Sequence, residues 1–218
     1  MPIDVLIDRL ATDLAPVRPR DVRREGLILA AVCLAELVLF LQMSGMRPDM
    51  GHGMQQPSFW WRLGCLGLIA LLAGTAALLS FAPEKSATRP LAWLLGLVVV
   101  SLAAGWLVLV GLGSGPGSHA TTLTARLDWR QGLQCAYRMV LLAVPPLVAL
   151  GLLMRRGAAT ERAATSWSVG IASAAWGAFV FVFACPSDDP LYIAVWYSVG
   201  CGLVCVITRL LLPRLTRW

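Results

Sequence analysis

Residues 91–112 read LAWLLGLVVVSLAAGWLVLVGL, a run of 22 residues without a charged side chain. About 20 apolar residues in a helix are enough to cross about 30 Å of hydrocarbon. Five further apolar runs, each long enough to span once its flanks are included, lie at residues 27–43, 63–81, 137–154, 167–184 and 191–212. A hydrophobic content of 58% also exceeds what a soluble domain tolerates. The sequence therefore predicts an all-α integral membrane protein, a bundle of six transmembrane helices.

The basic residues are distributed unevenly between the two sides of this predicted bundle. Cytoplasmic flanks of membrane spans retain Lys and Arg, so the side with more of them is predicted to face the cytoplasm. That side includes both termini. Its excess of basic residues explains the net charge of +6, so the charge does not indicate a nucleic-acid partner. Anionic membrane lipid is the expected partner of residues 18–24, and residues 1–25 do not resemble a cleavable signal. The side holds 13 of the 18 basic residues, namely Arg9, Arg18, Arg20, Arg23, Arg24, Lys85, Arg89, Arg155, Arg156, Arg162, Arg209, Arg214 and Arg217.

Residues 1–24 form a predicted cytoplasmic tail, and residues 25–218 form the transmembrane domain. Apolar residues in the tail recur with helical spacing, which predicts a short amphipathic helix. These are Ile3, Leu6, Ile7, Leu10 and Leu14. A 12-residue helix is marginal alone in water, so it needs an apolar partner. A groove on a cytoplasmic protein and the membrane surface both fit, although acids outnumber bases three to one within the helix, which argues against anionic lipid.

Two cysteines are predicted to lie at the same exterior boundary of the bundle. Cys135 ends the loop before residues 137–154, and Cys185 follows residues 167–184. Thiols that face an oxidising space form a disulfide when their Cα atoms lie within about 7 Å of each other. This pair is a candidate for reversible redox chemistry or metal binding, and Cys65 is a competing partner. The remaining three, Cys33, Cys201 and Cys205, are predicted to pack as small hydrophobic residues.

The loop after residues 27–43 is rich in soft metal donors. Met46, Met50, His52 and Met54 suit a monovalent copper site, unless the methionines are ordinary interfacial hydrophobes. No catalytic motif is present, so we expect neither an enzyme, a cofactor nor a small-molecule substrate.

Glu36 lies in the middle of residues 27–43, where a charge is costly and marks a candidate functional residue. It predicts either a small proton- or metal-linked transporter or a structural hydrogen bond to a neighbouring helix. Two other features predict how the helices assemble. The adjacent prolines Pro145 and Pro146 should kink their helix, and a stripe of small residues should allow close helix packing. The stripe comprises Gly170, Ala174 and Ala178.

Several short motifs follow one another along the chain. They are IDRL at 7–10, DLAPVRP at 13–19, MRPDM at 46–50, Cys135 ahead of Pro145 and Pro146, RRGA at 155–158, and CPSDDPLYIAVWY at 185–197. In these residues the chain resembles the NrsF-type membrane anti-sigma factors, six-span proteins of the bacterial inner membrane. The resemblance extends over nearly the whole chain.

The resemblance implies that the tail holds an extracytoplasmic-function sigma factor at the membrane. The expected sigma-binding residues are Ile3, Leu6, Ile7, Leu10, Asp13 and Leu14. It also implies that heavy-metal or oxidative stress acts on two exterior cysteines, which map to Cys135 and Cys185, and releases the sigma factor.

Overall fold

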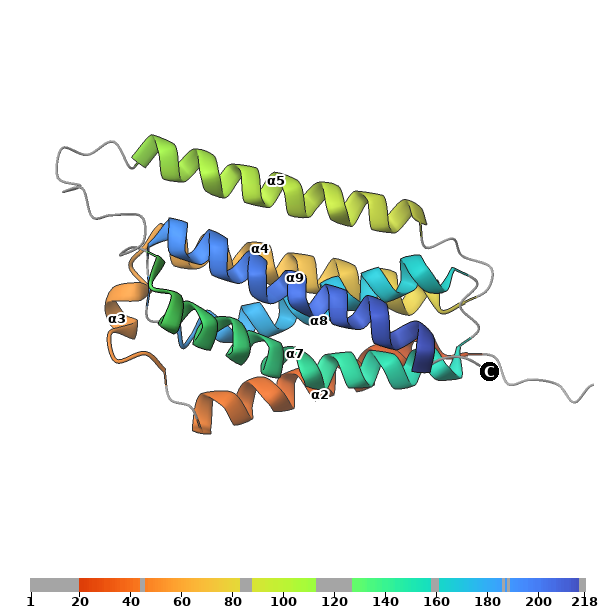
Figure 1. Cartoon of the computed structure of the whole chain (residues 1–218). Helices are drawn as coiled ribbons and strands as arrows, with labels where there is room; N and C mark the ends of the chain where they lie inside the picture. Colours follow the sequence, from red (N-terminus) through yellow and green to blue (C-terminus); the bar gives the residue numbers. More distant parts are fainter. Residues whose placement is uncertain are drawn as a thin grey trace, which may run out of the picture.

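The computed structural model describes residues 20–43, 46–82, 88–112, 127–157, 161–185, 187 and 189–215, without the side chains of residues 105–112 and 190. Every regular element in this part of the chain is a helix, as predicted. In chain order these are α2 (Val22–Met43), α3 (Met50–Gly53), α4 (Pro57–Ser80), α5 (Thr88–Leu112), α7 (Trp129–Arg156), α8 (Arg162–Phe181) and α9 (Pro190–Leu215). The long helices run along one common direction (Figure 1).

Each predicted apolar run forms a long helix, but the bounds differ. Five helices are long and apolar enough to cross a membrane, namely α2, α4, α7, α8 and α9. In α5, the part whose side chains are described, Thr88–Ala104, is a shorter apolar helix. Five candidate spans are therefore present, not clearly the six predicted. Helix α4 begins at Pro57 and α7 at Trp129, both before the apolar run starts, because backbone hydrogen bonding continues past the hydrocarbon. Helix α8 ends earlier than predicted, at Phe181, and a turn follows.

Helix α8 lies at the centre of the bundle and packs against α4, α7 and α9. Its sequence, RAATSWSVGIASAAWGAFVF, is rich in Ala, Ser and Gly, and most of its side chains are buried. Small side chains allow helix backbones to approach closely where lipid gives no hydrophobic driving force. A Cβ added at Gly177 would lie 2.7 Å from the carbonyl oxygen of Met139, and one added at Gly170 would lie 3.1 Å from Cys205 Cα. The predicted small-residue face is therefore a contact face, although Gly177 makes the closest approach.

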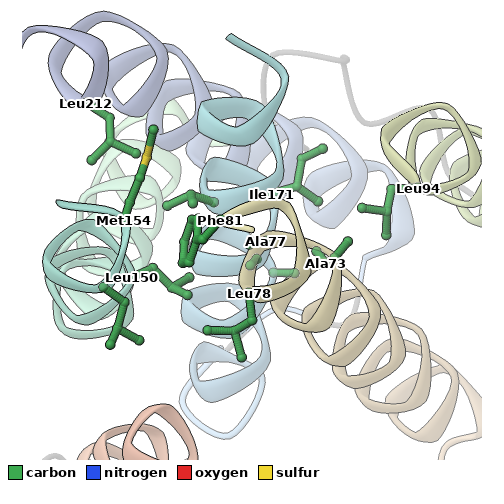
Figure 2. Close-up of a cluster of buried hydrophobic side chains, with 14 of the residues drawn as sticks. Ala73, Ala77, Leu78, Phe81, Leu94, Leu150, Met154, Ile171 and Leu212 are labelled. Atoms are coloured by element: carbon green, nitrogen blue, oxygen red, sulfur yellow. The ribbon is translucent and has the colours of Figure 1, made fainter. Parts of the chain in front are cut away.

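The largest cluster of buried hydrophobic side chains fills the space between α8 and four neighbouring helices (Figure 2). Leu78 and Phe81 enter from the end of α4, Leu94 from α5, Leu150 from α7, Ile171 from α8 and Leu212 from α9. Phe81 is completely buried although it follows the last residue of α4.

The outer faces of the peripheral helices carry large exposed apolar side chains. Leu27 on α2, Leu71 on α4 and Trp93 on α5 are 71%, 65% and 83% exposed. No residue of α2 is buried. Apolar faces of this extent are unusual for a soluble monomer and suit a helix bundle surrounded by lipid.

The Pro145–Pro146 pair lies within α7, and the helix changes direction where its colour passes from green to teal (Figure 1). Proline removes a backbone donor and clashes with the preceding turn, so a bend is the expected result. The predicted kink is confirmed.

The helix ends sort into two groups, and the grouping agrees with the charge distribution. At one end of the bundle, Arg20 lies over the Phe81 ring, 5.0 Å from its centroid, and a Cβ on Gly157 would lie 2.9 Å from Phe81. At the same end the backbone N–H of Thr88 donates to Glu161 Oε2 at 3.1 Å. The starts of α2, α5 and α8 and the ends of α4 and α7 therefore share one end.

Candidate functional site

Cys135 and Cys185 lie in one buried cluster at the other end of the bundle. Cys135 is 5% exposed and Cys185 is fully buried. The expectation that Cys135 ends a loop is wrong, because α7 begins at Trp129 and Asp128 caps it by accepting from the Gln131 N–H. Cys185 follows the turn after α8, where its backbone N–H donates to the carbonyl of Phe181 at 3.0 Å.

Two tyrosines of α9 accompany the two thiols. The Cys135 sulfur lies 3.3 Å from the Tyr192 hydroxyl, and either group is able to donate. The Cys185 thiol donates to the carbonyl of Ser187 at 3.6 Å. Tyr197 lies further along α9 and is buried in the same cluster as the two thiols. Three segments of the chain thus meet at the thiols.

A tryptophan fixes the position of α9 against the start of α7. Trp196 Nε1 donates to the carbonyl of Leu127 at 2.9 Å, and a Cβ added at Gly132 would lie 1.8 Å from the indole. Only glycine leaves room for this ring. Tyr192 lies one turn earlier than Trp196 on the same helix, with ring centroids 6.4 Å apart, so the indole helps to hold the phenol at Cys135.

Both thiols are free and belong to the same buried cluster. Two thiols that approach each other are able to form a disulfide on oxidation, or to offer two soft ligands to a metal ion. Among the described residues, no three His, Cys, Asp or Glu side chains are gathered as a metal site. Both the redox role and the metal role of the pair stay predictions.

The methionine- and histidine-rich loop divides between two environments. Met50, in α3, packs into the buried cluster of Cys135 and Cys185. Met46 and Met54 are 52% and 44% exposed, and His52 is exposed as well. The copper site proposed from their composition stays a prediction.

Arg47, from the same loop, is 6% exposed. Its Nε and Nη2 donate to Asp49 Oδ1 and Oδ2 at 2.7 and 2.5 Å. These hydrogen bonds hold the pKa of the Asp49 carboxyl at about 2. The backbone N–H of Arg47 donates to the carbonyl of Phe183 at 3.2 Å, two residues before Cys185.

Of the remaining cysteines, Cys201 packs against the cluster of Cys135 and Cys185, whereas Cys65 and Cys205 lie outside it. Cys65 contacts the Ser101 hydroxyl on α5 and is not part of the cluster around Cys135. Cys201 donates to the carbonyl of Ala174 at 3.8 Å, and Cys205 packs beside Gly170. Cys201 and Cys205 are therefore packing residues, as predicted.

Glu36 accepts a hydrogen bond from Trp176 Nε1 on α8 at 3.0 Å. Its Oε1 is buried and has no hydrogen-bond partner among the described residues. The predicted structural bond to a neighbouring helix is present.

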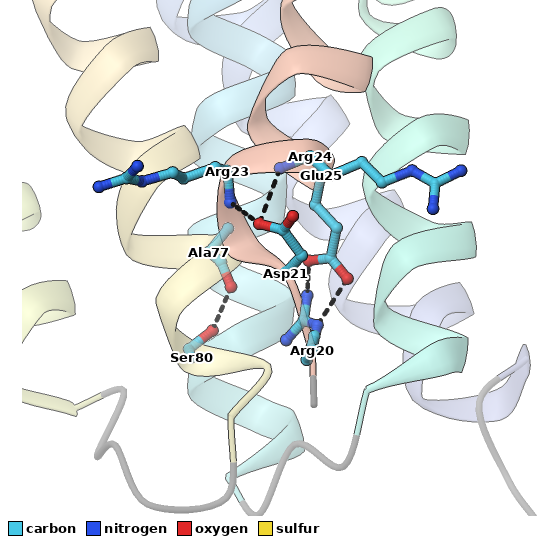
Figure 3. A network of polar contacts seen from close by, with 7 residues as sticks. All are labelled: Arg20, Asp21, Arg23, Arg24, Glu25, Ala77 and Ser80. Atoms are coloured by element: carbon cyan, nitrogen blue, oxygen red, sulfur yellow. Dashed lines mark hydrogen bonds and ion pairs between the residues drawn. The ribbon is translucent and has the colours of Figure 1, made fainter. Parts of the chain in front are cut away.

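The predicted sigma-binding residues, Ile3, Leu6, Ile7, Leu10, Asp13 and Leu14, lie outside the described residues. The structure does show how the segment after them is attached (Figure 3). Asp21 Oδ1 accepts from the backbone N–H groups of Arg23 and Arg24 at 3.0 and 3.2 Å and so caps α2. Arg20 forms an ion pair with Glu25 while it stacks on Phe81.

Sequence reasoning did not identify the partners of these residues. Tyr192 and Trp196 belong to the CPSDDPLYIAVWY motif and are four residues apart, which places them on one helix face. That spacing was a usable signal. Nothing local in the sequence pairs Trp176 with Glu36, which is 140 residues away.

Comparison with known proteins identifies the family. The family model described as "Negative regulator of sigma F" (NrsF) matches residues 10–218. The chain is 31% identical over 202 residues to the "Anti-sigma-F factor NrsF" of Caulobacter vibrioides, with 92% of each chain covered. It is 24% identical over 220 residues to the "Probable anti-sigma-F factor NrsF" of Azospira oryzae, with both chains covered completely. No solved structure matches it. The resemblance inferred from the motifs is confirmed, and the chain belongs to the NrsF family of negative regulators of sigma F.

Proposed function

We propose that this protein is a six-span anti-sigma factor of the bacterial inner membrane with both termini in the cytoplasm. Residues 1–24 hold an extracytoplasmic-function sigma factor away from RNA polymerase. Heavy-metal or oxidative stress acts on Cys135 and Cys185 and releases it. The observation that carries the proposal is the burial of these two thiols in one cluster although 50 positions separate them in the chain.

The placement of the thiols supports a sensing role rather than simple packing. Each contacts or faces a polar group of the α9 region, Tyr192 for Cys135 and Ser187 for Cys185. Their joining would connect α7 to the turn after α8. A covalent or metal link there changes the geometry of two helices at once, which is what a switch requires.

The apolar stripe of the tail supports its sigma-binding role. Arg20 is the first described residue, and it is seated on the bundle by Phe81 and Glu25. The described part of the chain therefore begins at the end of the bundle remote from the thiols. An amphipathic segment presented at that place suits a helix-in-groove contact with a cytoplasmic protein.

Helix α5 completes the six spans in this proposal. Phe81, at the end of α4, lies near Arg20 and Gly157, whereas Leu127, just before α7, lies at the opposite end beside Trp196. The chain must cross the bundle between these two points. Helix α5 has 25 residues, and a helix of that length is about 37 Å long.

The test uses a reporter gene that depends on the cognate sigma factor. Deletion of residues 2–20 should switch the reporter on without stress. A Cys135→Ser/Cys185→Ser variant should stay repressed when cadmium chloride or the thiol oxidant diamide is added. In the oxidative arm the two thiols lose two protons and two electrons to diamide and form a disulfide.

Cys65→Ser and Cys205→Ser are matched controls that remove a thiol outside the cluster of Cys135 and Cys185, and both should respond as wild type. Continued repression by the tail deletion would refute the anti-sigma role. Normal induction of the double variant would refute the assignment of the sensing thiols. If the reporter were unaffected by every one of these changes, the transporter alternative based on Glu36 would become the better interpretation.

A further inference from the structure

A signal at the thiols has to reach a tail that is attached at the opposite end of the bundle. Helix α2 continues directly from the tail, since Arg20 and Asp21 precede its first residue. Its other end leads to Arg47. It is therefore the element that joins the two ends of the bundle and is also covalently continuous with the tail.

Helix α2 is held by few contacts. None of its residues is buried, whereas most of α8 is. A helix with few buried apolar contacts is displaced at low free-energy cost. Its position therefore depends strongly on the specific polar contacts that it makes.

One of those contacts, and one made by the segment after α2, lead to the part of the chain that carries Cys185. In the middle of α2, Glu36 accepts from Trp176, nine residues before Cys185. After its exterior end, the Arg47 N–H donates to the carbonyl of Phe183, two residues before Cys185. The Arg47 guanidinium is held in place by Asp49. A displacement of this part of the chain therefore acts on α2 through Glu36 and on the segment that follows α2 through Arg47.

A third contact lies where α2 meets the tail. Arg20 pairs with Glu25 (Figure 3). It also stacks on Phe81, and its Nη1 lies 3.4 Å from a Cβ position at Gly157. The residue that begins the described chain is thus seated between the ends of α4 and α7. A shift of α2 changes these contacts of Arg20, and with them the direction in which the tail leaves the bundle.

We propose that α2 transmits the state of Cys185 to the N-terminal tail. The Trp176–Glu36 and Phe183–Arg47 hydrogen bonds connect the Cys185 segment to α2 and the residues after it, and the contacts of Arg20 with Phe81 and Glu25 pass the change to the tail. This inference rests on the proposed function. It adds the route by which the exterior thiols control the tail.

The first experiment measures amide hydrogen exchange in the full-length wild-type protein in lipid nanodiscs, with and without diamide. Oxidation should accelerate exchange by at least about 5-fold at the amides of residues 20–26 and 47, the lower range of typical allosteric coupling. The Cys135→Ser/Cys185→Ser variant should show no change. Unchanged exchange along α2, in a sample whose thiols are oxidised by mass, would overturn the inference.

The second experiment breaks the central coupling. Trp176→Phe removes the indole donor but keeps a ring to stack on Phe179, which lies 5.2 Å away between centroids. Glu36→Leu removes the acceptor. Both variants should retain repression and normal thiol oxidation, but their reporter induction should be at least about 5-fold lower than that of wild type. Trp93→Phe is the matched control, because this indole on α5 is 83% exposed.

The two levels of the proposal fail in different ways. Wild-type induction in both variants, at wild-type abundance, overturns the α2 route while leaving the thiol sensor intact. A sensor that is wrong reveals itself through the double cysteine variant, which would then induce normally. Should a substitution lower the membrane abundance, the exchange measurement on unmodified protein decides the question alone.

Discussion

At the scale of single residues, the hydroxyl of Tyr192 is the polar partner of Cys135 within the buried cluster. A hydrogen bond of this kind contributes about 0.5–1.5 kcal/mol, and leaving one buried partner without it costs at least as much. Tyr192→Phe should therefore lower the free energy of unfolding in detergent by about 0.5–1.5 kcal/mol. Tyr137→Phe should have no effect, because this side chain, on the helix α7 that also carries Cys135, is 64% exposed. Equal stability of both variants would contradict a role for this contact.

The Arg47–Asp49 pair predicts a pH dependence. The guanidinium lowers the pKa of Asp49 from 3.8 to about 2, so the folded state binds this proton less readily than the unfolded chain does. The pair therefore stabilises the protein above pH 4, and its contribution falls as the pH drops towards 2. Asp49→Asn should lower the unfolding temperature at pH 7, and the gap to wild type should close between pH 4 and pH 2. A gap that stays constant over this range would exclude the ion pair as its cause.

At the scale of helices, the sequence predicted which segments are helical but not where each begins. Hydropathy ends where the hydrocarbon ends, whereas hydrogen bonding continues until a cap or a proline stops it. Asp128 and Pro57 are such signals, and they place the starts of α7 and α4 before the apolar runs. The consequence for the site is direct, since Cys135 belongs to a helix and not to a loop.

The close contact between α7 and α8 gives a prediction at the same scale. A Cβ on Gly177 would approach Met139 O and Ala143 N to 2.7 and 2.8 Å, and neither backbone is free to move. Gly177→Ala should lower the free energy of unfolding by about 1–3 kcal/mol, as overpacking does. Gly202→Ala is the matched control, because nothing lies within 4 Å of that position on α9. It should be neutral or stabilising, since alanine has the higher helix propensity.

At the scale of the whole molecule, the pairing of helices is what the sequence left open. Charge distribution predicted which loops share an end, and the seat of Arg20 beside Phe81 and Gly157 agrees with it. It did not predict that Trp176 meets Glu36 or that Tyr192 meets Cys135. Helix order in a bilayer is decided by surface shape and small-residue contacts distributed over many positions, and no short motif encodes it.

The topology of the whole chain gives the last prediction. If α5 crosses the membrane, the segments before and after it face opposite sides. Residue 86 lies before α5 on the arginine-rich side, and residue 118 lies after it. Ser118→Cys should react with a membrane-impermeant maleimide in intact cells, whereas Ser86→Cys should react only after the membrane is permeabilised. Wild-type protein should give little background, because its six cysteines are buried or half-buried. Labelling of both variants in intact cells would leave α5 on one side of the membrane, reduce the bundle to five spans, and place the C-terminus on the side opposite to the tail.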